Sequence, residues 1–172
     1  IAFRRYPATG LFLRHKYIKL QGGDDEPGNG GSSGWAGFVC RFSYPELQLI
    51  GRYVGYQGLK RGEAVFREGD PGSFMLILVE GQLSIYKGGE HGQRLLSYEG
   101  RGRVVEMALI DRERRSASCM VDSDCLFVTL DHAGLEGLAE EAPGLAYRFM
   151  LSLARLLSKR LRRTSGLLVE HL

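Results

Sequence analysis

The stretch that decides the fold is Gly100-Arg101-Gly102-Arg103-Val104-Val105-Glu106-Met107-Ala108-Leu109-Ile110-Asp111-Arg112-Glu113-Arg114-Arg115-Ser116-Ala117. Glycines open it, and Arg115 stands nine positions after the carboxylate of Glu106. The apolar run from Met107 to Ile110 is long enough for one turn of helix, and a β-like segment follows Ser116. The pattern therefore predicts a glycine-led turn, a single helical turn and a return into a sheet.

The residue types in this stretch suit a sugar phosphate. The first turn of a helix has backbone N–H groups without intrahelical partners, which here are the amides of Met107 and Ala108. Arg115 offers a fork of donors that matches phosphate. Glu106 cannot bind phosphate, but it can accept hydrogen bonds from sugar hydroxyls. Ser116 either gives a hydroxyl to the phosphate or simply occupies a strand position. The sequence therefore predicts a ribose-phosphate site.

The same residues resemble the phosphate-binding cassette of the cyclic nucleotide-binding domain family. That family's pattern is roughly Gly-Glu-(Met/Leu)-Ala-Leu, a short loop, and Arg-(Ser/Ala/Thr)-Ala, which Glu106–Leu109 and Arg115–Ala117 match with the usual separation. The resemblance implies that Glu106 holds the ribose 2′-hydroxyl and that Arg115 holds the cyclic phosphate. Where the family has glycine before the glutamate, this chain has Val105, whose side chain would hinder close approach of a ligand to the backbone.

Short strand patterns separated by glycine turns run from residue 53 to about residue 130. In Gln82–Tyr86 the alternation predicts that Leu83 and Ile85 point inward. The candidate strands are Tyr53–Leu59, Glu63–Phe66, Phe74–Val79, Gln82–Lys87, Arg94–Tyr98, Ser116–Val121 and Cys125–Leu130. Many short strands at regular spacing predict a mainly β fold, an antiparallel β-roll or jelly roll with flanking helices.

Further spaced motifs extend the resemblance to about residues 43–165. They are Gly62, the turn Gly69-Asp70-Pro71-Gly72, and an apolar strand followed by Gly81 and a second strand. In the cyclic nucleotide-binding domain family the corresponding pattern is a glycine, seven residues, Gly-Asp, an apolar strand, and then a glycine with a second strand. Several motifs in the right order make the resemblance specific for the fold.

Helix signals flank the strand region. Ser43 and Glu46 form a capping box that predicts a helix over about 44–52. Asp131 predicts a cap for a helix to about residue 140, and Pro143 marks the start of a last, leucine-rich helix. Two interpretations of this last helix stay open. Its leucines pack on the roll and its basic residues are solvated, or it closes over the ligand, dimerises or relays a signal.

The remaining sequence predicts two parts, a basic flank with a glycine-rich linker at 1–42 and a cyclic nucleotide-binding-like domain at 43–172. Residues 1–20 are basic and aromatic, and we interpret them as an extended flank in preference to a patch for lipid or nucleic acid. Residues 21–34 hold six glycines in fourteen positions, which predicts a flexible linker. The chain does not begin with methionine, so we expect it to be a piece of a larger protein.

Composition narrows the function classes. The 172 residues are 44% hydrophobic with a net charge of +3, which suits one domain with an ordinary core. The three cysteines include no CxxC pair, so neither a disulfide framework nor a zinc site is expected. The four histidines are scattered and are expected on the surface. With no catalytic constellation, we expect neither an enzyme nor a bound cofactor or metal.

Two function hypotheses follow. The first is a regulatory domain that binds cAMP or cGMP through Glu106, Met107, Ala108, Arg115 and Ser116, and whose last helix signals to an attached domain. The alternative, motivated by Val105, is a degenerate module that binds no nucleotide and serves protein interaction or dimerisation. The expected partners are the nucleotide, an attached effector and a second copy through the last helix, with no DNA. The segment from Arg115 onward resembles domains attached to bacterial sulfate-permease-type transporters, which implies a cytoplasmic place at the inner membrane.

Overall fold

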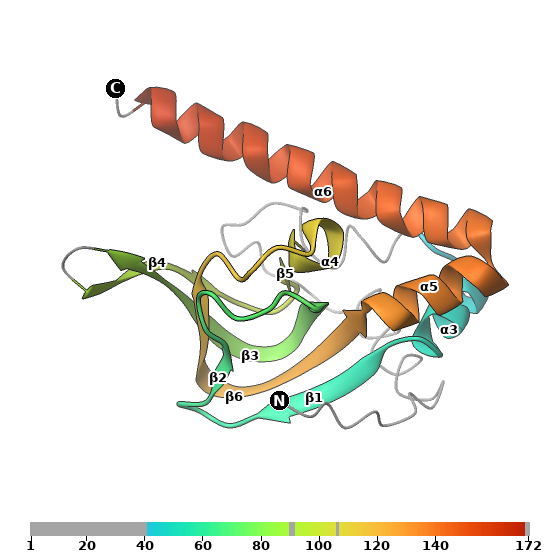
Figure 1. Ribbon diagram of the computed structural model, residues 1–172, viewed down its shortest axis with the longest axis horizontal. Helices are drawn as coiled ribbons and strands as arrows, with labels where there is room; N and C mark the ends of the chain where they lie inside the picture. The colour runs from blue at the N-terminus through green and yellow to red at the C-terminus, as the bar shows by residue number, and fades with distance from the viewer. Residues whose placement is uncertain (1–40, 90–91, 106, 171–172) are drawn as a thin grey trace, which may run out of the picture.

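The computed structural model describes residues 41–89, 92–105 and 107–170. Its elements are, in chain order, α3 (Tyr44–Gly51), β1 (Gly55–Leu59), β2 (Ala64–Phe66), β3 (Phe74–Gly89), β4 (Gly92–Glu99), β5 (Val104–Val105), α4 (Met107–Asp111), β6 (Ser118–Asp131), α5 (His132–Glu141) and α6 (Pro143–Glu170). The strands form a curved sheet with α3, α5 and α6 at one end, and α6 passes over the short helix α4 (Figure 1).

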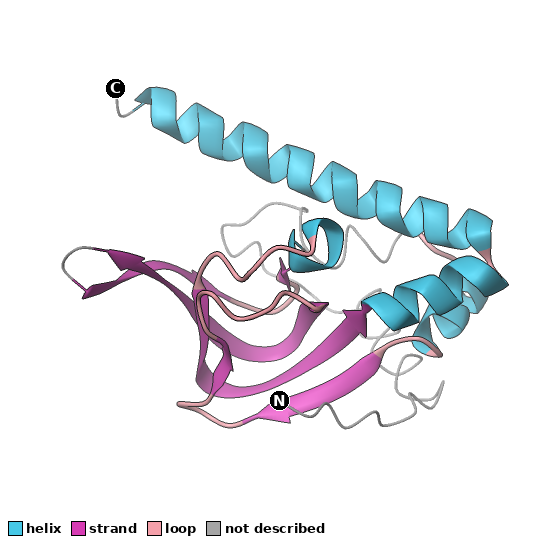
Figure 2. Cartoon of the chain, in the orientation of Figure 1, coloured by secondary structure: helices cyan, strands magenta, loops and turns pink. Residues whose placement is uncertain are grey.

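Two long strands, β3 and β6, are the backbone of the sheet. They pair antiparallel from Phe74–Asp131 to Tyr86–Ser118. The order is β1-β6-β3-β4, with β2 paired to β6 and β5 paired to β3, and every pairing is antiparallel (Figure 2). This architecture confirms the predicted mainly β, antiparallel roll with flanking helices.

The sequence predicted two separate strands, Phe74–Val79 and Gln82–Lys87, where the structure has the single strand β3. It likewise predicted Ser116–Val121 and Cys125–Leu130 where the structure has the single strand β6. The conformation of Gly81 explains why β3 continues where the sequence indicated a turn. Its φ of 94° lies in the left-handed region, and the register with β6 shifts on both sides of it. A Cβ at Gly81 would come within 2.5 Å of the Asp124 carbonyl oxygen. Gly81 therefore allows a shift of register, like a β-bulge, inside a strand that continues, whereas the sequence pattern had indicated a turn at which the strand ends.

The core consists of two clusters of buried side chains. One lies among the helices and the adjoining end of the sheet, and includes Leu138, Phe149 and Leu153. The other lies within the roll and includes Phe66, Phe74, Leu83 and Phe127. Leu83 is fully buried and Ile85 is partly buried against this second cluster, which confirms that both point inward.

Caps fix the N-terminal ends of α3 and α5, and an ion pair joins α6 to α3. The backbone N–H of Ser43 donates to Glu46 Oε2 at 2.8 Å, as the predicted capping box requires. Asp131 Oδ1 accepts from the Gly134 amide at 2.8 Å and caps α5. Ion pairs then join elements far apart in sequence, since Arg148 of α6 pairs with Glu46 of α3. Leu145, Leu153 and Leu156 of α6 are buried in the core, as one of the two interpretations of this helix predicted, whereas Leu161 is 69% exposed and does not pack on the roll.

The flanking residues add two details. Phe42, in the predicted flank, is buried with its ring 6.2 Å from that of Phe149. His132 was expected on the surface, but it starts α5 and its Nε2 is buried because the helix packs beside the sheet. The other three histidines lie outside the described residues.

Among the helices that the structure describes, none has a stretch long and apolar enough to cross a membrane.

Candidate functional site

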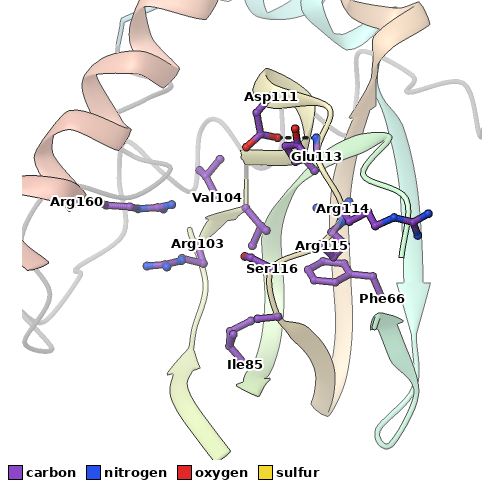
Figure 3. Close-up of a pocket in the computed structure, with 13 residues that line it drawn as sticks. Phe66, Ile85, Arg103, Val104, Asp111, Glu113, Arg114, Arg115, Ser116 and Arg160 are labelled. Carbon is purple, nitrogen blue, oxygen red and sulfur yellow. Dashed lines mark hydrogen bonds between the residues drawn. The ribbon is translucent and has the colours of Figure 1, made fainter. Parts of the chain in front are cut away.

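A pocket of about 290 Å³ lies between the predicted cassette, the sheet and α6 (Figure 3). Four arginines and two carboxylates line it, together with apolar and small side chains. These residues are Phe66, Ile85, Arg103, Val104, Val105, Ala108, Asp111, Glu113, Arg114, Arg115, Ser116, Ala117 and Arg160. The excess of cationic over anionic side chains makes this pocket suited to an anion.

Arg115 is the most deeply buried cation of the pocket, with only 5% of its surface exposed. Its guanidinium carbon lies 4.1 Å from the ring centroid of Phe66 and 4.3 Å from that of Phe74. Its Nη2 donates to the Phe74 carbonyl at 2.7 Å. Its Nε is buried without a hydrogen-bond partner. Two aromatic faces thus hold the guanidinium while part of its donor fork stays unused.

The electrostatics of Arg115 follow from this burial. Desolvation lowers the pKa of Arg115 to about 10, and the nearby carboxylates of Asp70 and Asp111 only partly counteract it. The side chain is therefore still cationic at neutral pH. It has no ion-pair partner among the residues that the structure describes. A buried cation without an anion is the arrangement that an incoming phosphate would relieve.

The Gly69-Asp70 motif holds the backbone of Arg115. The Arg115 amide donates to the Asp70 carbonyl at 2.9 Å, and the Gly69 amide donates to the Arg115 carbonyl at 2.9 Å. Arg114 Nη1 donates to the Gly69 carbonyl at 2.7 Å. Asp70 keeps the turn closed by accepting from the Arg67 amide at 2.8 Å. The Gly69-Asp70 turn is therefore hydrogen-bonded to the arginines of the cassette and holds this part of the pocket wall in place from behind.

A second support comes from the hairpin end of β3. Lys87 Nζ donates to the Ser116 carbonyl at 2.6 Å and to Glu68 Oε1 at 2.5 Å. The other oxygen of Glu68 accepts from the Gly88 amide at 2.7 Å. The hydrogen bond from Lys87, followed by that from Gly88, lowers the pKa of Glu68. Lys87 therefore joins the backbone beside Arg115 to two other parts of the roll.

The structure brings most of the predicted site residues together. Arg115, Ser116 and Ala108 line the pocket, and Ala108 is 4% exposed. Met107 begins the predicted helical turn, α4. Glu106 lies outside the described residues, so its expected contact with ribose stays a prediction.

Val105, the departure from the family pattern, lies in the two-residue strand β5 and pairs with Leu76. Its side chain is half-buried against the second core cluster and forms part of the pocket wall. The pocket therefore keeps its volume of about 290 Å³ with a valine at this position.

Sequence reasoning missed two arginines of the pocket. Arg103 lies just before β5 and forms an ion pair with Glu99 at 3.2 Å. Arg160 projects from α6 toward the same pocket, as Figure 3 shows. The sequence pattern placed Arg160 on the polar face of the last helix, but helical spacing alone does not reveal which cation faces the roll. The phenylalanines beside Arg115 had no sequence signal beyond ordinary strand hydrophobicity.

Comparison with known proteins places this geometry in a family. The family model described as "Cyclic nucleotide-binding domain" matches residues 56–142, just over half of the chain. A putative potassium channel protein of Rhodopseudomonas palustris is 35% identical over 89 residues, which are 51% of this chain and 21% of that protein. A CRP-like cAMP-activated global transcriptional regulator of Mycobacterium tuberculosis is 29% identical over 112 residues, 64% of this chain and 48% of that protein.

A solved structure shows the same fold. The crystal structure of a cyclic nucleotide-binding domain from Methylobacillus flagellatus KT superposes with a TM-score of 0.76 and 22% identity, covering 98% of this chain and 89% of that one. The chain spans less than half the length of each of the two curated relatives above.

Proposed function

We propose, since this chain belongs to the cyclic nucleotide-binding domain family, that its pocket binds a cyclic mononucleotide, either cAMP or cGMP, and that binding regulates an attached domain. Arg115 would hold the cyclic phosphate and Glu106 the ribose hydroxyl. The amides of Met107 and Ala108 and the hydroxyl of Ser116 would complete the phosphate contacts. The observation that carries this proposal is the buried guanidinium of Arg115, whose Nε has no partner on the wall of an open pocket.

The energetics of Arg115 favour an anionic ligand, and the pocket volume favours a compact one. An unsatisfied buried donor costs roughly 1–3 kcal/mol, and a phosphate oxygen that accepts from Nε would remove this cost. The phosphate would also give Arg115 the counter-ion that it lacks among the described residues. The pocket volume of about 290 Å³ is close to the lower end of the range for small-molecule sites, as expected for one nucleotide.

Helix α6 would carry the signal. Its first half packs in the core through Phe149 and Leu153, while Arg160, farther along, lines the ligand pocket. A ligand that contacts both Arg115 and Arg160 would stabilise the arrangement in which α6 covers the pocket. Such differential binding shifts the population of helix positions, which an attached domain can sense.

The partners follow from the same proposal. In the two curated relatives the matched region is a minor part of the protein, which supports an attached effector in this case too. We propose a membrane transporter as that effector, and therefore a place at the cytoplasmic face of the membrane. Tyr147 and Leu161 are exposed at 68% and 69% and lie two heptads apart on α6, so a second copy of the chain could cover them. We do not propose DNA as a partner of this chain.

The test is isothermal titration of the full chain with cAMP and with cGMP, repeated on Arg115→Ala. We expect heat from one or both nucleotides with the wild type and none with the variant. Arg94→Ala is the control, because Arg94 is an exposed arginine of β4 that does not line the pocket. Binding that survives equally in Arg115→Ala would contradict the phosphate role of Arg115.

A second function is favoured by one observation, the valine side chain in the pocket wall. If folded wild-type protein gives no heat with either nucleotide, the alternative of a nucleotide-free interaction module replaces the proposal. Val105→Gly then becomes the informative variant. Nucleotide binding that appears only in Val105→Gly would show that the valine closes the site.

A further inference from the structure

Helix α6 has an unusual charge distribution. Between Pro143 and Val169 the sequence holds six basic residues and no acidic one. Two of the six have roles within the fold, since Arg148 pairs with Glu46 and Arg160 lines the pocket. The other four, here called the basic stripe, are Arg155, Lys159, Arg162 and Arg163, and all are exposed.

The basic stripe gathers four cations without ion pairs on one helix, whereas exposed cations of the roll that also lack an ion pair among the described residues, such as Arg61 and Arg94, lie on separate elements. In the roll and its flanking helices, Arg52, Lys60, Lys87, Arg103 and Arg112 each form an ion pair with a carboxylate. No residue of the stripe has an ion pair within the part of the chain that the structure describes. Like charges at i, i+4, as at Arg155 with Lys159 and Lys159 with Arg163, cost an isolated helix a few tenths of a kcal/mol each.

The spacing aligns the four cations. At 3.6 residues per turn, positions 155, 159, 162 and 163 fall within an arc of about 100°, and they extend over about 12 Å of helix. This arc lies away from the line through Tyr147 and Leu161, so a second copy docked on that line would leave the stripe exposed. A flat anionic surface can therefore contact all four side chains together.

We propose that the basic stripe of α6 docks on an anionic lipid bilayer. The proposal rests on the proposed place of the chain at the cytoplasmic face of a membrane, the leaflet surface where anionic headgroups attract clustered Lys and Arg. Nucleic acid is the competing polyanion. The stretch from Arg155 to Arg163 contains no aromatic residue to stack on bases, and its Arg and Lys side chains suit lipid phosphates and nucleic acid alike, so the proposed place at a membrane favours lipid and the DNA arm of the test separates the two.

The test is co-sedimentation of the full chain, without nucleotide, with phosphatidylcholine vesicles that contain or lack phosphatidylglycerol. We expect binding only to the anionic vesicles, and weaker binding as salt is raised. Lys159→Gln with Arg163→Gln should reduce the binding roughly 25-fold, from about fivefold for each cation. The matched control is Arg61→Gln with Arg94→Gln, which removes the same charge from exposed positions of the roll. The basic residues 1–20 are present in every variant, so the difference reports on α6.

Three results would overturn the proposal. They are equal binding by the stripe variant and the control variant, binding that ignores the headgroup charge, and tighter binding to a DNA duplex than to vesicles at equal phosphate concentration. Thermal unfolding checks the fold of each variant. The nucleotide titration separates the two proposals, because the stripe variant should bind nucleotide like the wild type. Failure of the wild type to bind nucleotide would leave the vesicle result standing.

Discussion

Arg115 donates from Nη2 to the backbone carbonyl of Phe74 at 2.7 Å, and the ring of the same phenylalanine lies 4.3 Å from its guanidinium carbon. Phe74 therefore fixes both the direction and the plane of the guanidinium. Phe66 covers a second side of the guanidinium at 4.1 Å, and its ring stands at 70° to that of Phe74 with the centroids 6.5 Å apart, so the two rings form a corner around Arg115. Because Arg115 is only 5% exposed and its Nε is buried, a phosphate that bonds to this donor requires a small shift of the guanidinium toward the pocket, while the two rings limit how far it can turn.

This arrangement predicts that Arg115 serves binding more than stability. Arg115→Met keeps an unbranched side chain against the two rings and removes a buried charge, but it also removes the cation–π contacts and the hydrogen bond to the Phe74 carbonyl. Removing the buried charge should stabilise the protein, whereas losing the cation–π contacts and the hydrogen bond should destabilise it by a similar amount. We therefore expect the free energy of unfolding to change by no more than about 1 kcal/mol. Urea denaturation measures this change. A loss above about 3 kcal/mol would instead show that the arginine is a structural residue.

The bridge from Lys87 predicts an effect on both pH dependence and binding. Since the pKa of Glu68 is below its ordinary value of 4.5, its stabilising contribution is present above that pH and is lost as the pH falls through the lower, folded-state value. Lys87→Met should therefore destabilise the protein near neutral pH, and the difference from the wild type should shrink below pH 4.5. Denaturation at several pH values measures it.

The same variant tests whether the bridge positions the site. Without Lys87 the Ser116 carbonyl loses its donor, so nucleotide affinity should fall, and Lys87→Arg should restore part of it. Arg94→Met, which changes an exposed cation on the neighbouring strand, is the control. Unchanged affinity in Lys87→Met would limit the bridge to a role in stability.

The sequence predicted the roll because its signals are local. Strand alternation and the caps at Ser43 and Asp131 depend on neighbouring residues, and the structure has both caps in place and buries Leu83, whereas the turn predicted at Gly81 lies inside β3. The extents of β3 and β6 were not predictable in the same way. Whether Gly81 ends a strand or bends it depends on Asp124 and Cys125 of β6, which approach it across the sheet.

The same distinction between local sequence signals and long-range contacts applies to the candidate site. Ala108, Arg115 and Ser116 share one motif, so the sequence pattern placed them together. The contact of Arg115 with Phe66 and Phe74 depends on how β2 and β3 meet the cassette loop. Arg160 reaches the pocket only because α6 crosses over it, and no local pattern encodes that crossing.

Arg160 provides a third prediction. If it contacts the nucleotide from α6, Arg160→Gln should weaken binding about tenfold, the loss expected for one charge-assisted hydrogen bond of about 1.5 kcal/mol. Arg155→Gln is the control, because it removes the same charge from a side chain of α6 that does not line the pocket. Isothermal titration of both variants measures the difference. Equal affinities would show that α6 covers the pocket without contacting the ligand.

The closest packing around the pocket gives the last prediction. A Cβ at Gly72 would lie 2.1 Å from the Glu113 carbonyl oxygen and 2.5 Å from the Ala108 Cβ. Gly72→Ala must therefore push apart the turn after Gly69-Asp70 and the cassette loop, which should cost about 1–3 kcal/mol of stability and weaken nucleotide binding. Gly144→Ala is the control, because a Cβ there meets no atom within 4 Å, and α6 should be as stable or slightly more stable. Denaturation and titration of both variants test this, and wild-type values for Gly72→Ala would mean that the loop yields without cost.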